Sequence, residues 1–114
     1  MSSVDLNRVR EVADGDEQFF QELFTIFLDD AAQQIHVLRQ AVEQHDATAV
    51  RRTAHRLKGA SSNVGARPFS SLCLRLEQTV GQGSLDQVPS LILDMQEEYA
   101  RLQQFLAQLP RGGP

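Results

Sequence analysis

The sequence predicts an all-α fold, an antiparallel up-down four-helix bundle with a short additional helix at the N-terminus. Apolar residues recur at spacings of three and four along most of the chain, which is typical of amphipathic helices. There is no β-rich alternating stretch, and only a few residues separate one helical pattern from the next. Four substantial helices joined by such short loops pack most simply as an up-down bundle.

The first two helices are predicted on either side of the turn Ala13-Asp14-Gly15. We expect a short helix over about residues 5–12 and a long one over about residues 16–44, with Asp14 or Asp16 as its N-cap. The apolar stripe of the long helix consists of Phe20, Phe24, Phe27, Ala31, Ile35, Leu38 and Val42.

A third helix is predicted over residues 47–63, with Asp46 as its N-cap. Gly65 suits the left-handed position that follows a helix C-terminus. Pro68 suits the first turn of a fourth helix, where the N–H that proline lacks has no helical partner. The run Gly81-Gln82-Gly83 ends this fourth helix. Its apolar stripe consists of Phe69, Leu72, Leu76 and Val80.

The fifth helix is expected to follow a capping box formed by Ser84 and Gln87, with Pro89 in its first turn. A chain of 114 residues can build one hydrophobic core but not two. We therefore expect a single domain over residues 1–110 and a loose tail over residues 111–114. The stripe of the fifth helix consists of Val88, Ile92, Met95, Tyr99, Leu102, Leu106 and Leu109.

The bulk composition argues against several classes of protein. A net charge of −4 argues against nucleic-acid binding, because phosphate contacts need a basic surface. No apolar run approaches the ~20 residues of a membrane span, and the N-terminus has no secretory signal pattern. The single cysteine, Cys73, cannot form an internal disulfide, which fits a reducing cytoplasm. We expect a cytoplasmic monomer, or the cytoplasmic end of a membrane-bound protein.

The third predicted helix has one polar and cationic face around His55. At about 100° per residue, the side chains within roughly 60° of His55 are those of Arg51, Arg52, Lys58, Gly59 and Ser62. The opposite face consists of Val50, Thr53, Leu57, Ala60 and Val64. A face of this kind suits a histidine that holds an anion in the open.

Gly59 lies in the middle of this helix, where glycine costs about 1 kcal/mol relative to alanine. Either the glycine is simply tolerated, or the missing β-carbon lets a phosphoryl group or a partner approach His55. Lys58 can likewise be an ordinary surface lysine, or it can neutralise the charge on a phosphorylated histidine. Four of the eleven basic residues, Arg51, Arg52, Arg56 and Lys58, lie close to His55 in sequence. This local positive patch points to a small anionic group or an acidic protein partner.

These residues also resemble the signature of a known family. The run Ala54-His55-x-Leu57-Lys58-Gly59-x-Ser61-Ser62, followed by Val64-Gly65-Ala66, is similar to the signature of histidine-containing phosphotransfer (HPt) domains. The acidic run Asp14-Gly15-Asp16-Glu17 before an aromatic-rich helix, and Leu76-Glu77 on the next helix but one, extend the resemblance. Members are small four-helix bundles that accept a phosphoryl group on this histidine and pass it on.

The resemblance implies a role for each matching residue. His55 is implied as the phosphorylated side chain, Lys58 as its charge partner and Gly59 as the position that keeps it accessible. Glu77 falls where the family often has an amide or acid near the imidazole, and Ser62 joins the residues expected to stabilise the phosphoryl group.

The implied reaction is reversible transfer between proteins. A receiver-domain phospho-aspartate donates to the histidine, and a second receiver aspartate later removes the group. Such transfer needs an in-line nucleophile and charge stabilisation. The Mg²⁺ is expected in the receiver's acidic pocket, with no cofactor on this chain, and a sensor or hybrid histidine kinase is expected upstream. His36 and His45 lack a second ligand at helical metal-site spacing, so no metal site is expected.

A second interpretation stays open. The N-terminal phosphoacceptor domain of a chemotaxis-type histidine kinase shares the His-x-x-Lys-Gly pattern and is phosphorylated from ATP by a separate catalytic domain. Transfer only from receivers would favour a relay domain instead. The sequence has no P-loop and no protein-kinase glycine loop, so we expect a phosphocarrier rather than an enzyme. A purely structural bundle leaves the cationic face of His55 unexplained.

Docking onto a partner needs a surface as well as a nucleophile. Arg51, Arg52 and Arg56 are candidates for its basic part. The first half of the second predicted helix is apolar over a wide arc, because Phe19, Leu23 and Ile26 lie beside its main stripe. We expect the short first helix to cover these three residues. The alternative is an exposed patch near the histidine, centred on Phe19 and Leu23, that meets the receiver.

Overall fold

The computed structural model describes residues 3–13 and 16–109. The described part contains helices and no strand, which confirms the predicted fold class. The helices are α1 (Leu6–Ala13), α2 (Glu17–Glu43), α3 (Ala47–Asn63), α4 (Arg67–Gly81) and α5 (Val88–Gln108). The tail predicted over residues 111–114 lies outside the described residues.

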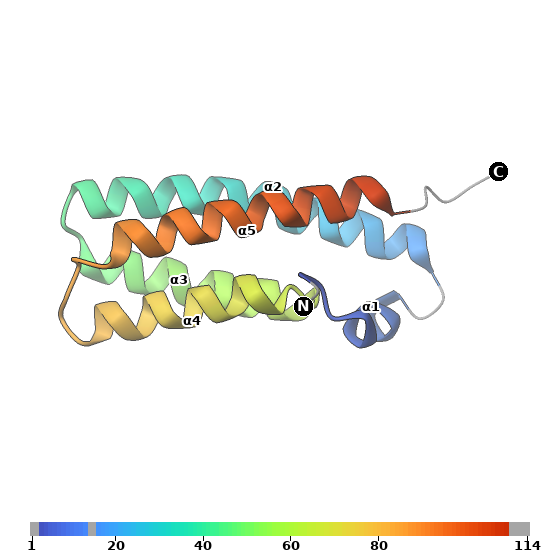
Figure 1. Cartoon of the computed structure of the whole chain (residues 1–114), viewed down its shortest axis with the longest axis horizontal. Helices are drawn as coiled ribbons and strands as arrows, with labels where there is room; N and C mark the ends of the chain where they lie inside the picture. Colours follow the sequence, from blue (N-terminus) through green and yellow to red (C-terminus); the bar gives the residue numbers. More distant parts are fainter. Residues whose placement is uncertain (1–2, 14–15, 110–114) are drawn as a thin grey trace.

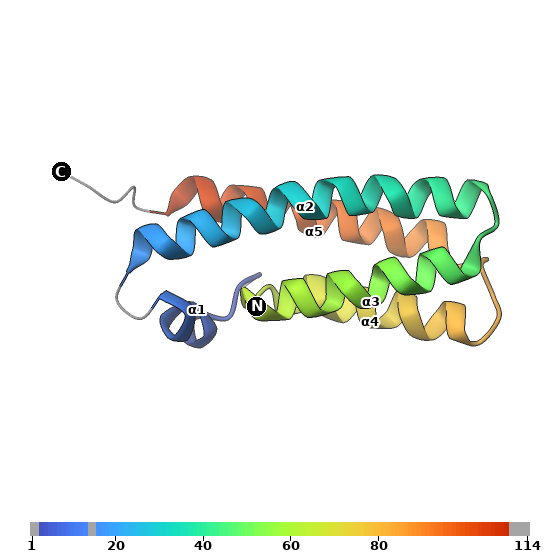
Figure 2. The ribbon, with the colours of Figure 1, turned by 180° about the vertical axis from the view of Figure 1, so that it is seen from behind.

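The four long helices form the predicted antiparallel bundle. Figure 1 shows α2 and α5 along one side and α3 and α4 along the other, and Figure 2 shows the same arrangement from behind. Each helix packs against two neighbours, since α2 contacts α3 and α5, and α4 contacts α3 and α5. The α3–α4 contact is the most extensive of these.

The short helix α1 occupies the end of the bundle where α2 extends beyond α3 and α4 (Figure 1). The segment before α1 is tied to the α3–α4 turn. Val4 is buried, and the Asp5 N–H donates to the carbonyl of Gly65 at 2.7 Å. The Arg67 guanidinium donates to the Asp5 carboxylate at 2.7 Å. The N-terminal segment is therefore hydrogen-bonded to the turn that follows α3.

The predicted helix termini of α2 and α3 are confirmed by their caps. Asp16 and Asp46 are the N-caps, and each carboxylate accepts from the backbone N–H three residues on, at 3.0 Å. Gly65 follows α3 with a φ of +79°, and an added Cβ would lie only 3.0 Å from Cβ of Arg8. Glycine is therefore required there both by conformation and by space.

The capping box predicted before α5 is wrong. Gln87 is the N-cap and its side chain makes no cap hydrogen bond. The hydroxyl of Ser84 accepts instead from the N–H of Asp86, at 3.3 Å. Helix α5 begins at Val88, because Pro89 has a helical φ and no N–H and is best placed in the first turn.

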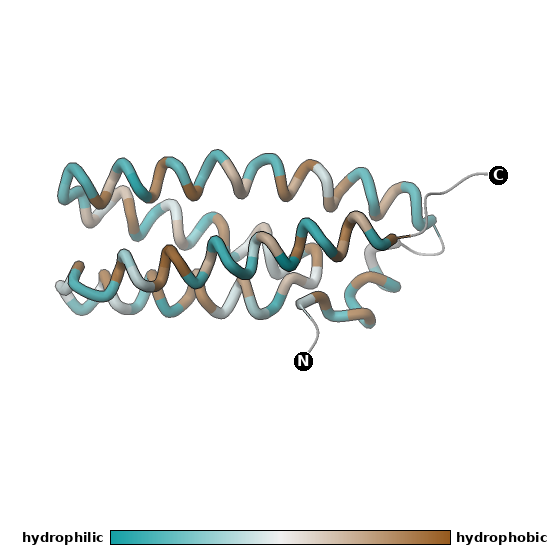
Figure 3. The backbone as a smooth tube through the Cα atoms, turned by 45° about the horizontal axis from the view of Figure 1, so that its top comes forward, coloured by the Kyte–Doolittle hydropathy of each residue, from teal (hydrophilic) through white to brown (hydrophobic). Residues whose placement is uncertain are grey.

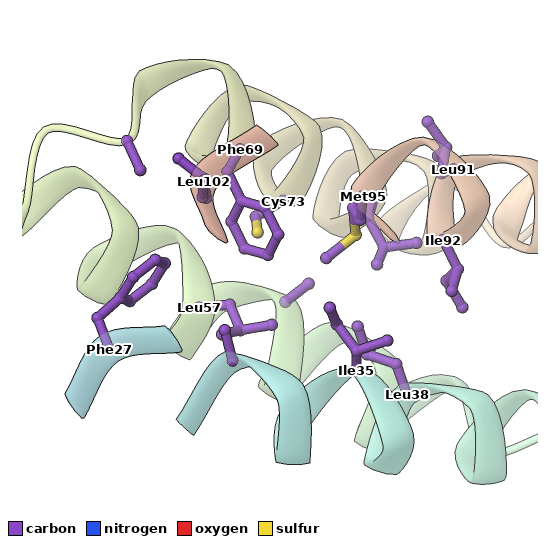
Figure 4. Close-up of a cluster of buried hydrophobic side chains, with 14 of the residues drawn as sticks. Phe27, Ile35, Leu38, Leu57, Phe69, Cys73, Leu91, Ile92, Met95 and Leu102 are labelled. Atoms are coloured by element: carbon purple, nitrogen blue, oxygen red, sulfur yellow. The ribbon is translucent and has the colours of Figure 1, made fainter. Parts of the chain in front are cut away.

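The core lies along the bundle axis and receives side chains from all four long helices. Figure 3 shows hydrophobic and hydrophilic positions alternating along each helix, as an amphipathic bundle requires. In Figure 4, Phe27 from α2, Leu57 from α3, Phe69 from α4 and Met95 from α5 point into the shared interior. The rings of Phe27 and Phe69 meet edge-on with centroids 6.0 Å apart. No helix in residues 3–13 or 16–109 is long and apolar enough to cross a membrane.

Candidate functional site

His55 lies on the outer face of α3, with 68% of its side chain exposed. The opposite face is anchored in the core, since Val50, Leu57 and Val64 are buried. Burying a side chain of this size contributes roughly 1.5–3 kcal/mol. The amphipathic pattern read from the sequence is thus confirmed, and it holds the histidine on the surface.

One carboxylate, that of Glu77, joins His55 to Lys58. Nδ1 of His55 lies 2.7 Å from Oε2 of Glu77 on α4, and Oε1 of the same carboxylate accepts from Nζ of Lys58 at 2.8 Å. Only 17% of the Glu77 side chain is exposed. We call this arrangement the His55–Glu77–Lys58 cluster. It brings together three of the residues that sequence reasoning named.

The cluster determines which ring nitrogen of His55 can react. The Lys58 ammonium holds the pKa of Glu77 below its ordinary 4.5, with a smaller contribution from His55, while burial acts in the opposite direction. An ionised carboxylate only accepts hydrogen bonds, so Nδ1 of His55 must carry the hydrogen. In the neutral ring Nε2 then has a free lone pair, and it has no hydrogen-bond partner among the described residues.

Gly59 lies one turn after His55, and its β position is open. A Cβ added there would have no atom within 4 Å, so packing inside the domain does not require glycine. On a helical wheel Gly59 lies on the side of His55 that faces α2, whereas Lys58 lies on the side that faces α4. The missing Cβ therefore leaves free space on the α2 side of the histidine.

Ser62 is not brought to His55. Its hydroxyl lies 2.6 Å from Oγ of Ser70 on α4, and Ser70 donates to the backbone carbonyl of Lys58 at 3.2 Å. The Ser70 proton is used in that bond, so Ser62 is the donor in the pair of hydroxyls. These bonds join α3 to α4 beside the cluster. Sequence reasoning missed Ser70, because nothing local distinguishes it from any other serine on a helix.

The predicted basic residues divide into two groups. Arg51 and Arg52 are exposed and form no ion pair with any described residue. Together with His55 and Glu77 they line an open hollow. Arg56 instead pairs with an acidic residue on α2.

The Arg56 guanidinium lies 3.0 Å from the carboxylate of Asp30, which was not predicted as a site residue. This pair shows which levels of α2 and α3 lie side by side. Ile26 lies one turn before Asp30, and the two helices run antiparallel, so Ile26 is at about the level of Gly59. The α2 side of the histidine therefore has an apolar residue at about the level of the open glycine.

The expectation that α1 covers the wide apolar arc of α2 is wrong for two of its three residues. Phe19 is 46% exposed and Ile26 is 65% exposed, whereas Leu23 is partly buried. The reason is the position of α1, whose preceding segment is held at the α3–α4 turn.

The other histidines form no comparable site. His36 and His45 are exposed, and His45 lies in the α2–α3 turn with a φ of +53°. No group of three or more histidine, cysteine, aspartate or glutamate side chains in the described residues is placed to hold a metal ion.

Comparison with known proteins places this geometry in a family. The Hpt domain family matches residues 22–108. The crystal structure of histidine-containing phosphotransfer protein B from Pseudomonas aeruginosa superposes with a TM-score of 0.88 at 31% identity, covering 93% of this chain and 92% of that one. The HPT domain of a Shewanella sensor hybrid histidine kinase has the same fold, with a TM-score of 0.75 at 21% identity and coverage of 96% and 97%.

Curated relatives are longer. Histidine-containing phosphotransfer protein 2 from Arabidopsis thaliana is 31% identical over 68 residues, which cover 57% of this chain and 44% of that protein. The chain spans about half the length of the curated relatives it matches. The family match covers most of the chain. The chain therefore belongs to the Hpt domain family.

Proposed function

We propose that this chain is a phosphocarrier, in which His55 accepts a phosphoryl group from a receiver-domain aspartate and passes it to another receiver. The observation that carries the proposal is the contact between Nδ1 of His55 and Glu77, at 2.7 Å on an exposed helix face. That contact leaves Nε2 as an exposed nucleophile with a defined orientation.

The step is a substitution at phosphorus. The Nε2 lone pair forms a bond to phosphorus while the bond from phosphorus to the aspartyl oxygen breaks, and the aspartate leaves as a carboxylate. No proton leaves the histidine, because Nδ1 keeps its hydrogen and the ring becomes an imidazolium. The reverse reaction returns the group to an aspartate. Positioning and charge stabilisation supply the catalysis in reactions of this kind.

Glu77 is proposed to support both directions of transfer. Its carboxylate holds the ring through Nδ1 and stabilises the positive charge that forms on it, in the way that an acidic residue orients a catalytic histidine. Lys58 is proposed to act through Glu77, because its ammonium holds that carboxylate in place at 2.8 Å.

The α2 side is proposed as the docking surface. Phe19 and Ile26 offer exposed apolar area, the open β position of Gly59 admits a partner close to the histidine, and the ion pair of Arg56 with Asp30 forms a charged edge at the same level. Leu23 contributes its partly exposed edge. An apolar patch with a charged rim is the usual composition of a transient protein interface.

The wider context belongs to the same proposal. The partners are receiver domains and a sensor or hybrid histidine kinase, and the receiver supplies the Mg²⁺ from its own acidic pocket. The chain acts as a cytoplasmic monomer that carries the group without binding a nucleotide, and it contacts neither nucleic acid nor a membrane.

The test is transfer of radiolabelled phosphate from a phosphorylated receiver. His55→Gln should accept no label, while His36→Gln removes an exposed histidine on α2 and should accept label like the wild type. Label on the His55→Gln variant would contradict the proposal.

A further inference from the structure

The open hollow beside His55 is lined by Thr48, Arg51, Arg52, His55 and Glu77. All of its α3 residues other than the histidine precede His55 in the chain. Side chains on a helix lean toward its N-terminus, so the imidazole leans toward this hollow. The space next to the reactive ring is therefore on the arginine side of the histidine.

Arg51 and Arg52 flank the histidine from one turn away. They lie four and three residues before His55, which places them about 40° to one side of it and about 60° to the other on a helical wheel. A group bonded to the ring thus has one guanidinium on each side within reach of a long side chain.

Of the three cations on the face of α3 around His55, one is paired with a carboxylate and two are not paired with any described residue. The Lys58 ammonium is already bonded to Glu77, and only 30% of its side chain is exposed. The charges of Lys58 and Glu77 cancel, so this pair brings no net positive charge to a phosphoryl group. Arg51 and Arg52 are exposed and have no acidic partner among the described residues.

We propose that Arg51 and Arg52, rather than Lys58, bind the phosphoryl oxygens while the group is on His55. This inference rests on the proposed function and assigns the charge partner of the same site. A phosphoryl group carries close to two negative charges and three acceptor oxygens. Two guanidinium groups match that charge, and their planar N–H pairs fit phosphate oxygens better than an ammonium does. Lys58 is then a positioning residue for Glu77.

Chemical phosphorylation with phosphoramidate tests this without any receiver. In that reaction Nε2 forms a bond to phosphorus, the P–N bond of phosphoramidate breaks, and ammonia leaves with the electron pair and a proton. We expect Arg51→Gln and Arg52→Gln each to lower the labelling rate of His55 by roughly three- to fivefold, in keeping with the strength of exposed ion pairs. The loss should disappear in about 1 M NaCl, where the Debye length is about 3 Å.

Matched variants separate this role from a general loss of charge. Arg75→Gln removes an exposed arginine from α4 and should label like the wild type. Arg51→Lys and Arg52→Lys should recover part of the lost rate. Thermal unfolding should be unchanged in all of these variants, since both arginines are exposed and glutamine is a good helix former.

If phosphoramidate labels Arg51→Gln and Arg52→Gln as fast as Arg75→Gln, the inference is overturned. This holds even if the same two variants accept phosphate more slowly from a receiver. In that case the arginines contact the receiver instead. Failure of the proposed function looks different. It would appear as a His55 that takes label from phosphoramidate normally but takes none from any receiver.

Discussion

The two sides of α3 are built differently. On the α4 side, His55 and Lys58 are both bonded to Glu77, and the hydroxyls of Ser62 and Ser70 are bonded to each other beside them. On the α2 side, one exposed ion pair joins the helices, and beside it lie an open glycine and an exposed isoleucine. We propose that the α4 side orients the nucleophile and that the α2 side receives a partner.

This difference suits a glycine at position 59 in our proposal, although glycine is a poor helix former. Bonded side chains on both sides of His55 would orient the imidazole but would also block the approach of a partner. Exposed glycine in a helix interior costs roughly 0.5–1 kcal/mol relative to alanine. Since an added Cβ at Gly59 would meet nothing within 4 Å, packing inside the domain does not require glycine, and we propose that the approach of a partner does.

The largest effect is expected from filling the α2 side. Gly59→Leu should lower transfer from a receiver by about a hundredfold, because a displacement of about 1 Å at a reacting centre can cost that much. The same variant should be at least as stable as the wild type in thermal unfolding, since leucine is a better helix former than glycine.

The matched measurement for Gly59→Leu is phosphorylation by phosphoramidate, which needs no docking surface and should be nearly unaffected. A variant that transfers at the wild-type rate, or one that unfolds at a much lower temperature, would contradict the role assigned to the open glycine.

A smaller effect is expected from the apolar part of the α2 side. Phe19→Asp and Ile26→Asp should each slow transfer about fivefold, which corresponds to the loss of about 1 kcal/mol at an interface. Both side chains are exposed, so the free energy of unfolding should change by less than about 0.5 kcal/mol. Leu93→Asp is the control, because Leu93 is 57% exposed on α5 and lies outside the proposed surface. Equal transfer rates for all three variants would remove the docking assignment.

The smallest effect is expected from lowering the pH, which protonates Glu77 on the α4 side and lowers the free energy of unfolding. The pKa of Glu77 is lowered in the folded protein, mainly by Lys58, so the carboxylate contributes stability above its ordinary pKa of 4.5. That contribution is lost as the pH falls through the lowered pKa. Relative to Glu77→Gln, the wild type should be more stable by up to about 1 kcal/mol near neutral pH. The difference in free energy of unfolding, measured with urea for both proteins, should disappear at acidic pH. A difference that widens on acidification would contradict the bonded cluster.

Local sequence signals predicted most of the fold. The apolar stripes gave the four long helices, and Asp16, Asp46 and Gly65 marked their ends correctly because caps and left-handed turns depend on adjacent residues. The capping box at Ser84 failed because Pro89, a few residues on, determined where α5 begins.

From the residues alone, only the part of the site that lies on a single helix could be predicted. His55, Lys58 and Gly59 share a helix face, so their spacing revealed them, whereas Glu77 was found through the family resemblance. Asp30 and Ser70 were missed because their roles arise from contacts between helices, and the sequence does not show which helix faces meet. The placement of α1 also depends on such contacts, which is why the exposure of Phe19 came from the structure.

We propose above all that Glu77 orients His55 so that Nε2 is the nucleophile. Nitrogen-15 and phosphorus-31 NMR of the domain, phosphorylated by a receiver, tests it most directly. We predict phosphorus coupled to Nε2 of His55, with Nδ1 still protonated and bonded to Glu77. Phosphorus coupled to Nδ1, or to any other residue, would contradict it.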